Sequence, residues 1–109
     1  MFNNNLSIES VDLIPDYVVS CSQMDASYIQ RNGYFKVLCL ICQFSADIPI
    51  RSPFYTLPDG YRPQKRVKFA MQTYWNNLPC TISILPNGDV ISDDILKSGI
   101  WYFFYTTFN

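Results

Sequence analysis

The sequence of 109 residues contains no histidine and only four glycines. Without an imidazole group the chain cannot build a histidine general acid, a Ser-His-Asp triad or a zinc site that uses histidine. The glycines stand singly, so the sequence also lacks the glycine-rich loop that cradles phosphate groups. These absences predict a protein that is not an enzyme and that needs no cofactor.

Charge is scarce as well. Charged residues make up 16% of the chain, and its 8 Lys plus Arg against 9 Asp plus Glu give a net charge of -1. Such a chain has no long-range field that would attract nucleic acid or an anionic membrane. The longest apolar runs, residues 37–42 and 100–105, are far shorter than a membrane span, and residues 1–5 do not resemble a signal peptide. We therefore expect no nucleic-acid partner, no membrane insertion and synthesis in a cytoplasm.

The sequence is rich in apolar residues (49%) and in aromatic residues (17%). They occur in short runs of Val, Ile, Tyr, Phe and Thr that Pro, Gly, Asn and Asp separate, without a helical period. The pattern predicts one all-β domain over residues 1–109, an antiparallel, jelly-roll-like β-sandwich of about eight strands. The predicted strands are residues 7–13, 17–21, 27–31, 34–44, 67–74, 81–85, 89–92 and 100–108.

Turn residues connect several of these strands. Asn32-Gly33 and Pro86-Asn87-Gly88 are typical of turns that close antiparallel hairpins. Four prolines occur within residues 47–64, where each removes a backbone donor, so we predict a long irregular connection there.

The predicted strands 34–44 and 100–108 are apolar on both faces. In a two-layer sandwich only one face of each sheet contacts the core, so the second face needs another cover. We favour a subunit interface; the alternative is that loops such as residues 47–64 fold over the outer faces. The predicted interface residues are Tyr34, Leu38, Leu40, Trp101 and Phe103.

Four cysteines, Cys21, Cys39, Cys42 and Cys80, raise the question of redox or metal chemistry. Residues three apart in a strand point to opposite faces, so Cys39-Leu40-Ile41-Cys42 is unsuited to a redox pair. We interpret the cysteines as small buried hydrophobes and expect no metal site.

Charged residues cluster in two places. We expect the pair Asp93-Asp94 to cap a turn. Four cations beside two aromatic residues could serve single-stranded nucleic acid, but we favour a solvated strand entry whose cations meet the acidic N-terminal stretch of the same or a neighbouring subunit. The cations are Arg62, Lys65, Arg66 and Lys68, the aromatic residues Tyr61 and Phe69, and the acids Glu9, Asp12 and Asp16.

Aromatic and amide side chains suggest where a ligand could bind. Sugar C–H groups stack on aromatic faces while hydroxyls bond to amides and carboxylates. The first candidate is the predicted loop with Tyr74, Trp75, Asn76 and Asn77; the alternative is that Trp75 packs on the sandwich or against a partner subunit. The second candidate is in the irregular connection, with Tyr55, Asp59 and Tyr61.

Residues 56–63, TLPDGYRP, are followed by VKFA at 67–70 and by ILPNGDV at 84–90. In this order the segments resemble the C-terminal domains of bacteriophage tail-fibre, baseplate and receptor-binding proteins, and residues 28–33, YIQRNG, are similar to the first hairpin of that family. The resemblance spans roughly residues 17–108. It implies a β-sandwich that commonly assembles as a homotrimer on a virion tail, beside other tail or baseplate proteins, and contacts a host-surface saccharide or protein.

Together these observations predict a non-enzymatic attachment or receptor-binding module of phage-tail type that recognises a host-surface ligand, in first place a saccharide. The alternative is a purely structural virion subunit that docks through its apolar sheet faces and binds no ligand. An enzyme acting on surface polysaccharide would require a pair of facing carboxylates.

Overall fold

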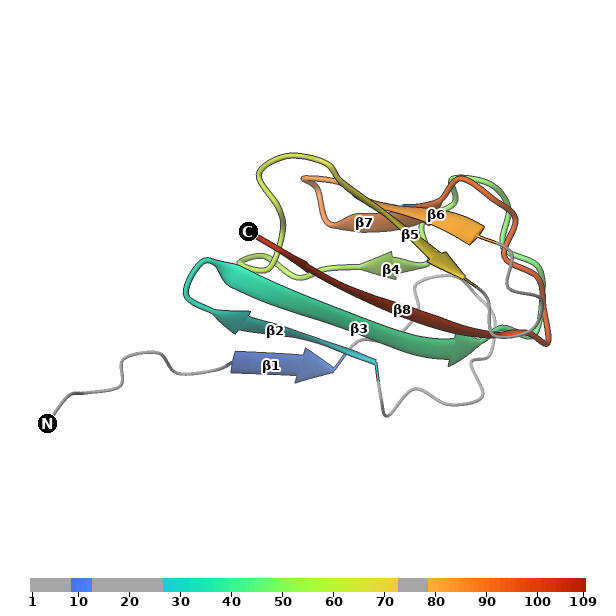
Figure 1. The fold of residues 1–109 in the computed structure, drawn as a ribbon, viewed down its shortest axis with the longest axis horizontal. Helices are drawn as coiled ribbons and strands as arrows, with labels where there is room; N and C mark the ends of the chain where they lie inside the picture. The colour runs from blue at the N-terminus through green and yellow to red at the C-terminus, as the bar shows by residue number, and fades with distance from the viewer. Residues whose placement is uncertain (1–8, 13–26, 73–78) are drawn as a thin grey trace, which may run out of the picture.

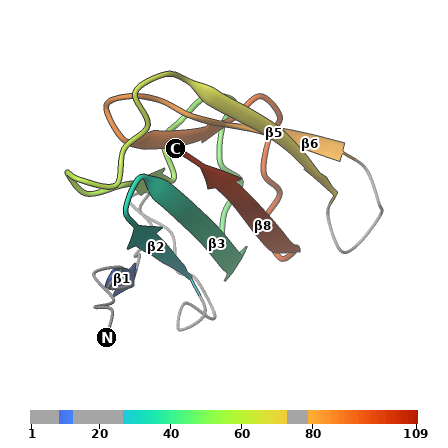
Figure 2. The same cartoon turned by 60° about the vertical axis from the view of Figure 1, so that its left-hand side comes forward.

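The computed structural model describes residues 9–12, 27–72 and 79–109. Two four-stranded antiparallel sheets face each other (Figure 1), which confirms the predicted β-sandwich. The first sheet has the strand order β1-β2-β3-β8 and the second β4-β7-β6-β5. Figure 2 shows the two layers, with β5 of the second sheet beside β8 of the first. No helix able to cross a membrane occurs in these described ranges.

The strands follow the apolar runs of the sequence. They are β1 (Glu9–Asp12), β2 (Tyr28–Asn32), β3 (Phe35–Gln43), β4 (Tyr55–Thr56), β5 (Val67–Gln72), β6 (Pro79–Ile84), β7 (Asp89–Ser92) and β8 (Trp101–Phe108). The predicted strand 17–21 lies outside the described residues. Each of the other predicted strands corresponds to an observed one, and β4 is the strand that the sequence prediction missed.

Both predicted hairpins are confirmed, but the first turn is shifted by one residue from the predicted Asn32-Gly33. Asn32 pairs with Phe35, so Gly33 and Tyr34 form the two-residue turn between β2 and β3, and Gly33 has a φ of 64°. Between β6 and β7, the Gly88 N–H donates to the Leu85 carbonyl at 2.8 Å. The turns therefore fix the central antiparallel pair of each sheet, β2-β3 in the first and β6-β7 in the second.

The core lies between the sheets, and the buried side chains alternate with more exposed ones along β3 and β8. In β3 the inward residues Leu38, Leu40 and Cys42 are fully buried, while their neighbours are half-buried. Leu38 and Leu40 were predicted to lie in a subunit interface, and this prediction is wrong. A side chain with no exposed surface in the single chain has nothing to offer a partner, so a partner could contact only the opposite face.

Residues 47–64 were predicted as a long irregular connection, and most of the segment is irregular; its regular parts are the two-residue β4 and the bridge between Ile48 and Leu96. The segment runs beside β7, where Phe54 N donates to the Val90 carbonyl at 3.0 Å and Leu57 N to the Gly88 carbonyl at 2.8 Å. Proline is tolerated in such an edge segment because its missing donor falls where no ladder bond is needed. The segment therefore completes the second sheet instead of covering an outer face.

Phe54, from this segment, occupies the centre of the core. Its ring contacts Phe44 edge-on at a centroid distance of 5.9 Å, Phe104 of β8 at 5.8 Å and Tyr55 of β4 at 5.6 Å. Edge-to-face and tilted pairs of this kind are favourable beyond their buried area. Phe54 thus joins the edge of the second sheet to the strands of the first.

We expect Phe54→Ala to lower the free energy of unfolding by about 3 to 5 kcal/mol, because it removes a fully buried ring and leaves a cavity. Denaturant unfolding followed by circular dichroism measures the change. Phe35→Ala, at a ring that is 48% exposed, serves as the control and should cost less than about 1 kcal/mol. Equal losses for the two variants would contradict a central role for Phe54.

Candidate ligand-binding site

Residues 56–63 and 84–90, two of the segments singled out in the sequence, pack against each other. Arg62 Nε donates to the Leu57 carbonyl at 2.8 Å, and that same carbonyl lies close to Gly88 in the β6–β7 turn. Gly88 has a φ of 96°, and a Cβ added there would lie 2.6 Å from both the Leu57 oxygen and Arg62 Nε. Only glycine fits this position, so loop 57–63 and the turn form one rigid unit.

Arg31 of β2 connects this unit to the first sheet. Its Nη1 donates to the Gly60 carbonyl at 2.8 Å, its guanidinium lies over the Tyr61 ring at 4.8 Å, and it forms an ion pair with Glu9 of β1. These contacts hold the loop beside the β2–β3 hairpin (Figure 1). The loop and the hairpin therefore define one end of the sandwich.

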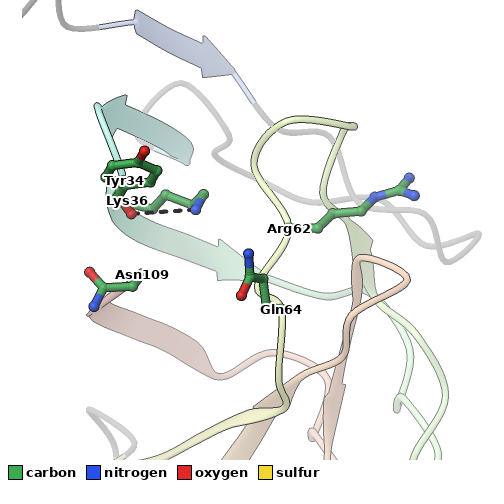
Figure 3. A pocket seen from close by; sticks show the side chains of 5 residues that line it. All are labelled: Tyr34, Lys36, Arg62, Gln64 and Asn109. Carbon is green, nitrogen blue, oxygen red and sulfur yellow. Dashed lines mark hydrogen bonds between the residues drawn. The ribbon is translucent and has the colours of Figure 1, made fainter.

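A pocket of about 560 Å³ opens at this end. The β2–β3 hairpin, the end of the chain beyond β8 and the segment leading to β5 contribute its walls (Figure 3). The described residues that line it are Tyr34, Lys36, Arg62, Gln64 and Asn109. Two amides, a phenol and an ammonium group thus gather around one cavity.

Lys36 carries the charge of this pocket. It occupies an inward position of β3, is 9% exposed, donates from Nζ to the Tyr34 carbonyl at 3.4 Å and lies 5.7 Å from the centre of the Phe108 ring. None of the carboxylates in the described ranges forms an ion pair with it. Burial lowers the pKa of Lys36, and the nearby Arg31 charge lowers it further.

Arg62 contributes differently. Its guanidinium is 3.1 Å from the Asp59 carboxylate and its Nε bonds to Leu57. Figure 3 shows the guanidinium pointing away from Lys36 and Gln64. The aliphatic stem of Arg62, not its charge, therefore faces the pocket. The Tyr34 side chain at the turn is 88% exposed.

The structure does not bring the predicted ligand-binding residues together in one site. Tyr55 is fully buried and Tyr61 is 8% exposed, so both belong to the core and the prediction that they contact a ligand is wrong. Asp59 is exposed and pairs with Arg62. The candidates Tyr74, Trp75, Asn76 and Asn77 lie outside the described residues.

Of the predicted interface residues, Tyr34 lies at the pocket, while Trp101 and Phe103 lie on the outer face of the first sheet. Sequence reasoning missed Lys36, Gln64 and Asn109 as pocket residues. The available signal was Lys36, a charged residue at an inward position of an otherwise apolar strand.

A smaller pocket of about 200 Å³ lies on the other side of the same hairpin. Gln30, Asn32, Phe35 and Val37 line it, and the Oδ1 atom of Asn32 is buried without a hydrogen-bond partner in the described structure. A buried acceptor without a partner is costly unless a ligand or solvent satisfies it.

Several further charged residues form ion pairs or hydrogen bonds away from the pocket. Asp93 pairs with Arg51 at 3.5 Å and with Lys68 at 3.4 Å, while Glu9 pairs with Arg31. Within one chain, the predicted pairing of the cation cluster with the N-terminal acids is therefore wrong for Lys68 and Glu9, and pairing with a neighbouring subunit stays a prediction. Asp94 accepts from Thr81 N at 3.2 Å, and its own N–H donates to Ser92 Oγ at 3.0 Å. The Asp94 carboxylate thus binds the backbone of β6, the Ser92 hydroxyl accepts the local bond of the turn, and Asp93 is an ion-pair partner, so these contacts do not confirm the capping prediction.

Cys39, Cys42 and Cys80, the cysteines of the described chain, form no disulfide bond. Cys42 is buried in the core and Cys39 lies on the opposite face, as the strand geometry predicts. Burial raises the pKa of Cys39 and of Cys80, which disfavours the reactive thiolate. In the described ranges no three His, Cys, Asp or Glu side chains gather where they could hold a metal ion.

Neither a scan against protein-family models nor a search of curated proteins finds a match to this chain.

We expect Gly88→Ala to lower the free energy of unfolding by about 3 kcal/mol or more, because it adds a close contact with Leu57 and Arg62 to an unfavourable φ. Gly99→Ala is the matched control, since Gly99 also has a positive φ but a Cβ there meets nothing within 4 Å. It should cost only about 1 kcal/mol. Similar losses in chemical denaturation would show that the packing of the loop on the turn is unimportant.

Proposed function

We propose that this protein is a non-enzymatic attachment or receptor-binding module of phage-tail type, which recognises a host-surface saccharide at the hairpin end of the sandwich. The observation that carries the proposal is Tyr34, a tyrosine that is 88% exposed and borders a pocket lined by amides. The ring offers a face for sugar C–H groups, and the Gln64 and Asn109 amides can donate to and accept from hydroxyls.

The second pocket supports the same use of the hairpin. It places the Gln30 and Asn32 amides beside Phe35, and the buried Asn32 oxygen is ready to accept a hydrogen bond. Aromatic rings next to amides thus occur on both sides of one turn. Neither set of described lining residues contains the carboxylate pair that glycoside hydrolysis requires, which favours binding over turnover.

The phage-tail part of the proposal rests on the resemblance of residues 56–63 and 84–90. Its support in the fold is indirect. The two segments pack on each other through Gly88, and the loop they hold leads directly to Arg62 and Gln64 at the pocket. We propose that the module forms a homotrimer on a virion tail, next to other tail or baseplate proteins.

We expect Tyr34→Ala to weaken binding of a saccharide found by glycan-array screening by about tenfold or more, because it removes the stacking face. Tyr105→Ala is the matched control, since Tyr105 is 60% exposed but lies on the outer sheet face. Titration calorimetry on both variants measures the effect. An unchanged affinity in Tyr34→Ala, or an equal loss in both, would contradict a saccharide site at the hairpin.

The second candidate function is a structural subunit that docks through the outer face of the first sheet without binding a ligand. Phe35, Phe103 and Tyr105 on that face are 48%, 39% and 60% exposed. Apolar patches on sheet faces are typical of subunit contacts.

Light scattering on a sizing column tests the role of this face in assembly. If it forms the subunit contact, the wild-type protein should elute as an oligomer whose mass does not change with concentration. Phe103→Glu should then give a monomer, because a buried unpaired carboxylate is unfavourable in an interface. A wild-type monomer at all concentrations would contradict both the homotrimer and the docking face.

A further inference from the structure

The Lys36 ammonium group is the unusual feature of the pocket. Lys36 as a whole residue is only 9% exposed, yet the contacts of its ammonium group with the described chain are a long hydrogen bond to the Tyr34 carbonyl and an approach to the Phe108 ring. A buried charge without a counterion lowers the stability of the folded protein, which is why such groups are usually paired. We propose that the saccharide bound here carries a carboxylate and that Lys36 Nζ binds this carboxylate inside the pocket.

This inference rests on the proposed saccharide function and adds the chemical class of the ligand. An ammonium group has three N–H donors, and one of them is used by the Tyr34 carbonyl. The other two are available to a ligand oxygen. Lys36 lines the pocket on the hairpin side, opposite Gln64, so an acid group bound to it leaves the sugar ring between the amides and Tyr34 (Figure 3).

The charges around Lys36 favour a ligand with a single negative charge. Arg31 already binds Glu9 and the Gly60 carbonyl, and Arg62 already binds Asp59 and the Leu57 carbonyl. Neither guanidinium therefore has its full charge available. One uncompensated ammonium matches a carboxylate, whereas a dianionic phosphate ester is typically held by several cations or by a bidentate arginine.

The first test is an array of oligosaccharides that contain glucuronic, galacturonic or sialic acid, each printed beside its methyl ester, together with sulfated sugars. We expect an acidic oligosaccharide to bind about 10- to 100-fold more tightly than its uncharged ester, as for a hydrogen-bonded charge pair. Equal binding of acid and ester would overturn the inference and leave the saccharide function standing. Binding of a sulfated sugar but no carboxylate would also overturn it, and no binding by any sugar would overturn both.

The second test changes the protein. Lys36→Met keeps an unbranched side chain that is one heavy atom shorter and removes the charge, so we expect the same 10- to 100-fold loss for the acid and no loss for the ester. The denaturation midpoint of Lys36→Met should be equal to or higher than that of the wild type, because an unpaired buried charge is removed. Lys65→Met, at an exposed lysine of the same segment as Gln64, is the control and should change neither property.

A marked loss of stability in Lys36→Met would mean that Lys36 serves the fold, and it would overturn the assignment. Should that variant be too unstable to titrate, Lys36→Gln provides a polar replacement of similar reach. An unchanged preference for the acid over the ester in either folded variant would likewise overturn the role of Lys36.

Discussion

The packing of Phe54 between the sheets is the contact on which the rest of the architecture depends. Phe54 belongs to a proline-containing segment with little strand character of its own. Its ring contacts Phe44, which follows β3, and Phe104 of β8, both on the side of the first sheet. Once this ring is buried, its backbone pairs with Val90 and Leu57 reaches Gly88. The loop that follows then leaves the sheet at a defined place and reaches the hairpin end, where the pocket forms.

The inward side chains of β3 are charged at the pocket end and apolar in the core. Along β3, the inward row begins with Lys36 and continues with Leu38 and Leu40. An apolar residue at the first position would extend the core, so the ammonium there reduces the stability that the fold could otherwise have. Residues that oppose local stability in this way are expected at binding sites, and this is the physical basis for assigning Lys36 to a ligand.

The β2–β3 hairpin carries two kinds of surface on one short turn. Tyr34 and Lys36 point to the pocket side, whereas Phe35 and Val37 belong to the smaller pocket on the outer face. Period-two alternation produces this division automatically. Saccharide binding and subunit docking can therefore use the same hairpin without competing for the same side chains, and the two proposals for this protein are compatible.

Features that depend on residues close together in the sequence could be predicted from the sequence. Alternation along β3 and β8, the turns at Gly33 and Gly88, and the opposite faces of Cys39 and Cys42 all follow from neighbours within a few residues, so they could be predicted. Period-two alternation could not say which face of β3 is inward, because both faces are apolar, and Leu38 and Leu40 were consequently assigned to an interface.

What the sequence by itself determined was the all-β class, most strand positions and the hairpins, since these depend on side-chain period and backbone preference. The tertiary structure alone decided that Tyr55 and Tyr61 are buried, that residues 54–57 complete a sheet, and that Lys36, Gln64 and Tyr34 meet around one cavity. These outcomes depend on contacts between residues far apart in the chain, such as Arg31 with Gly60. Such contacts form only when the two sheets pack, so no local pattern encodes them.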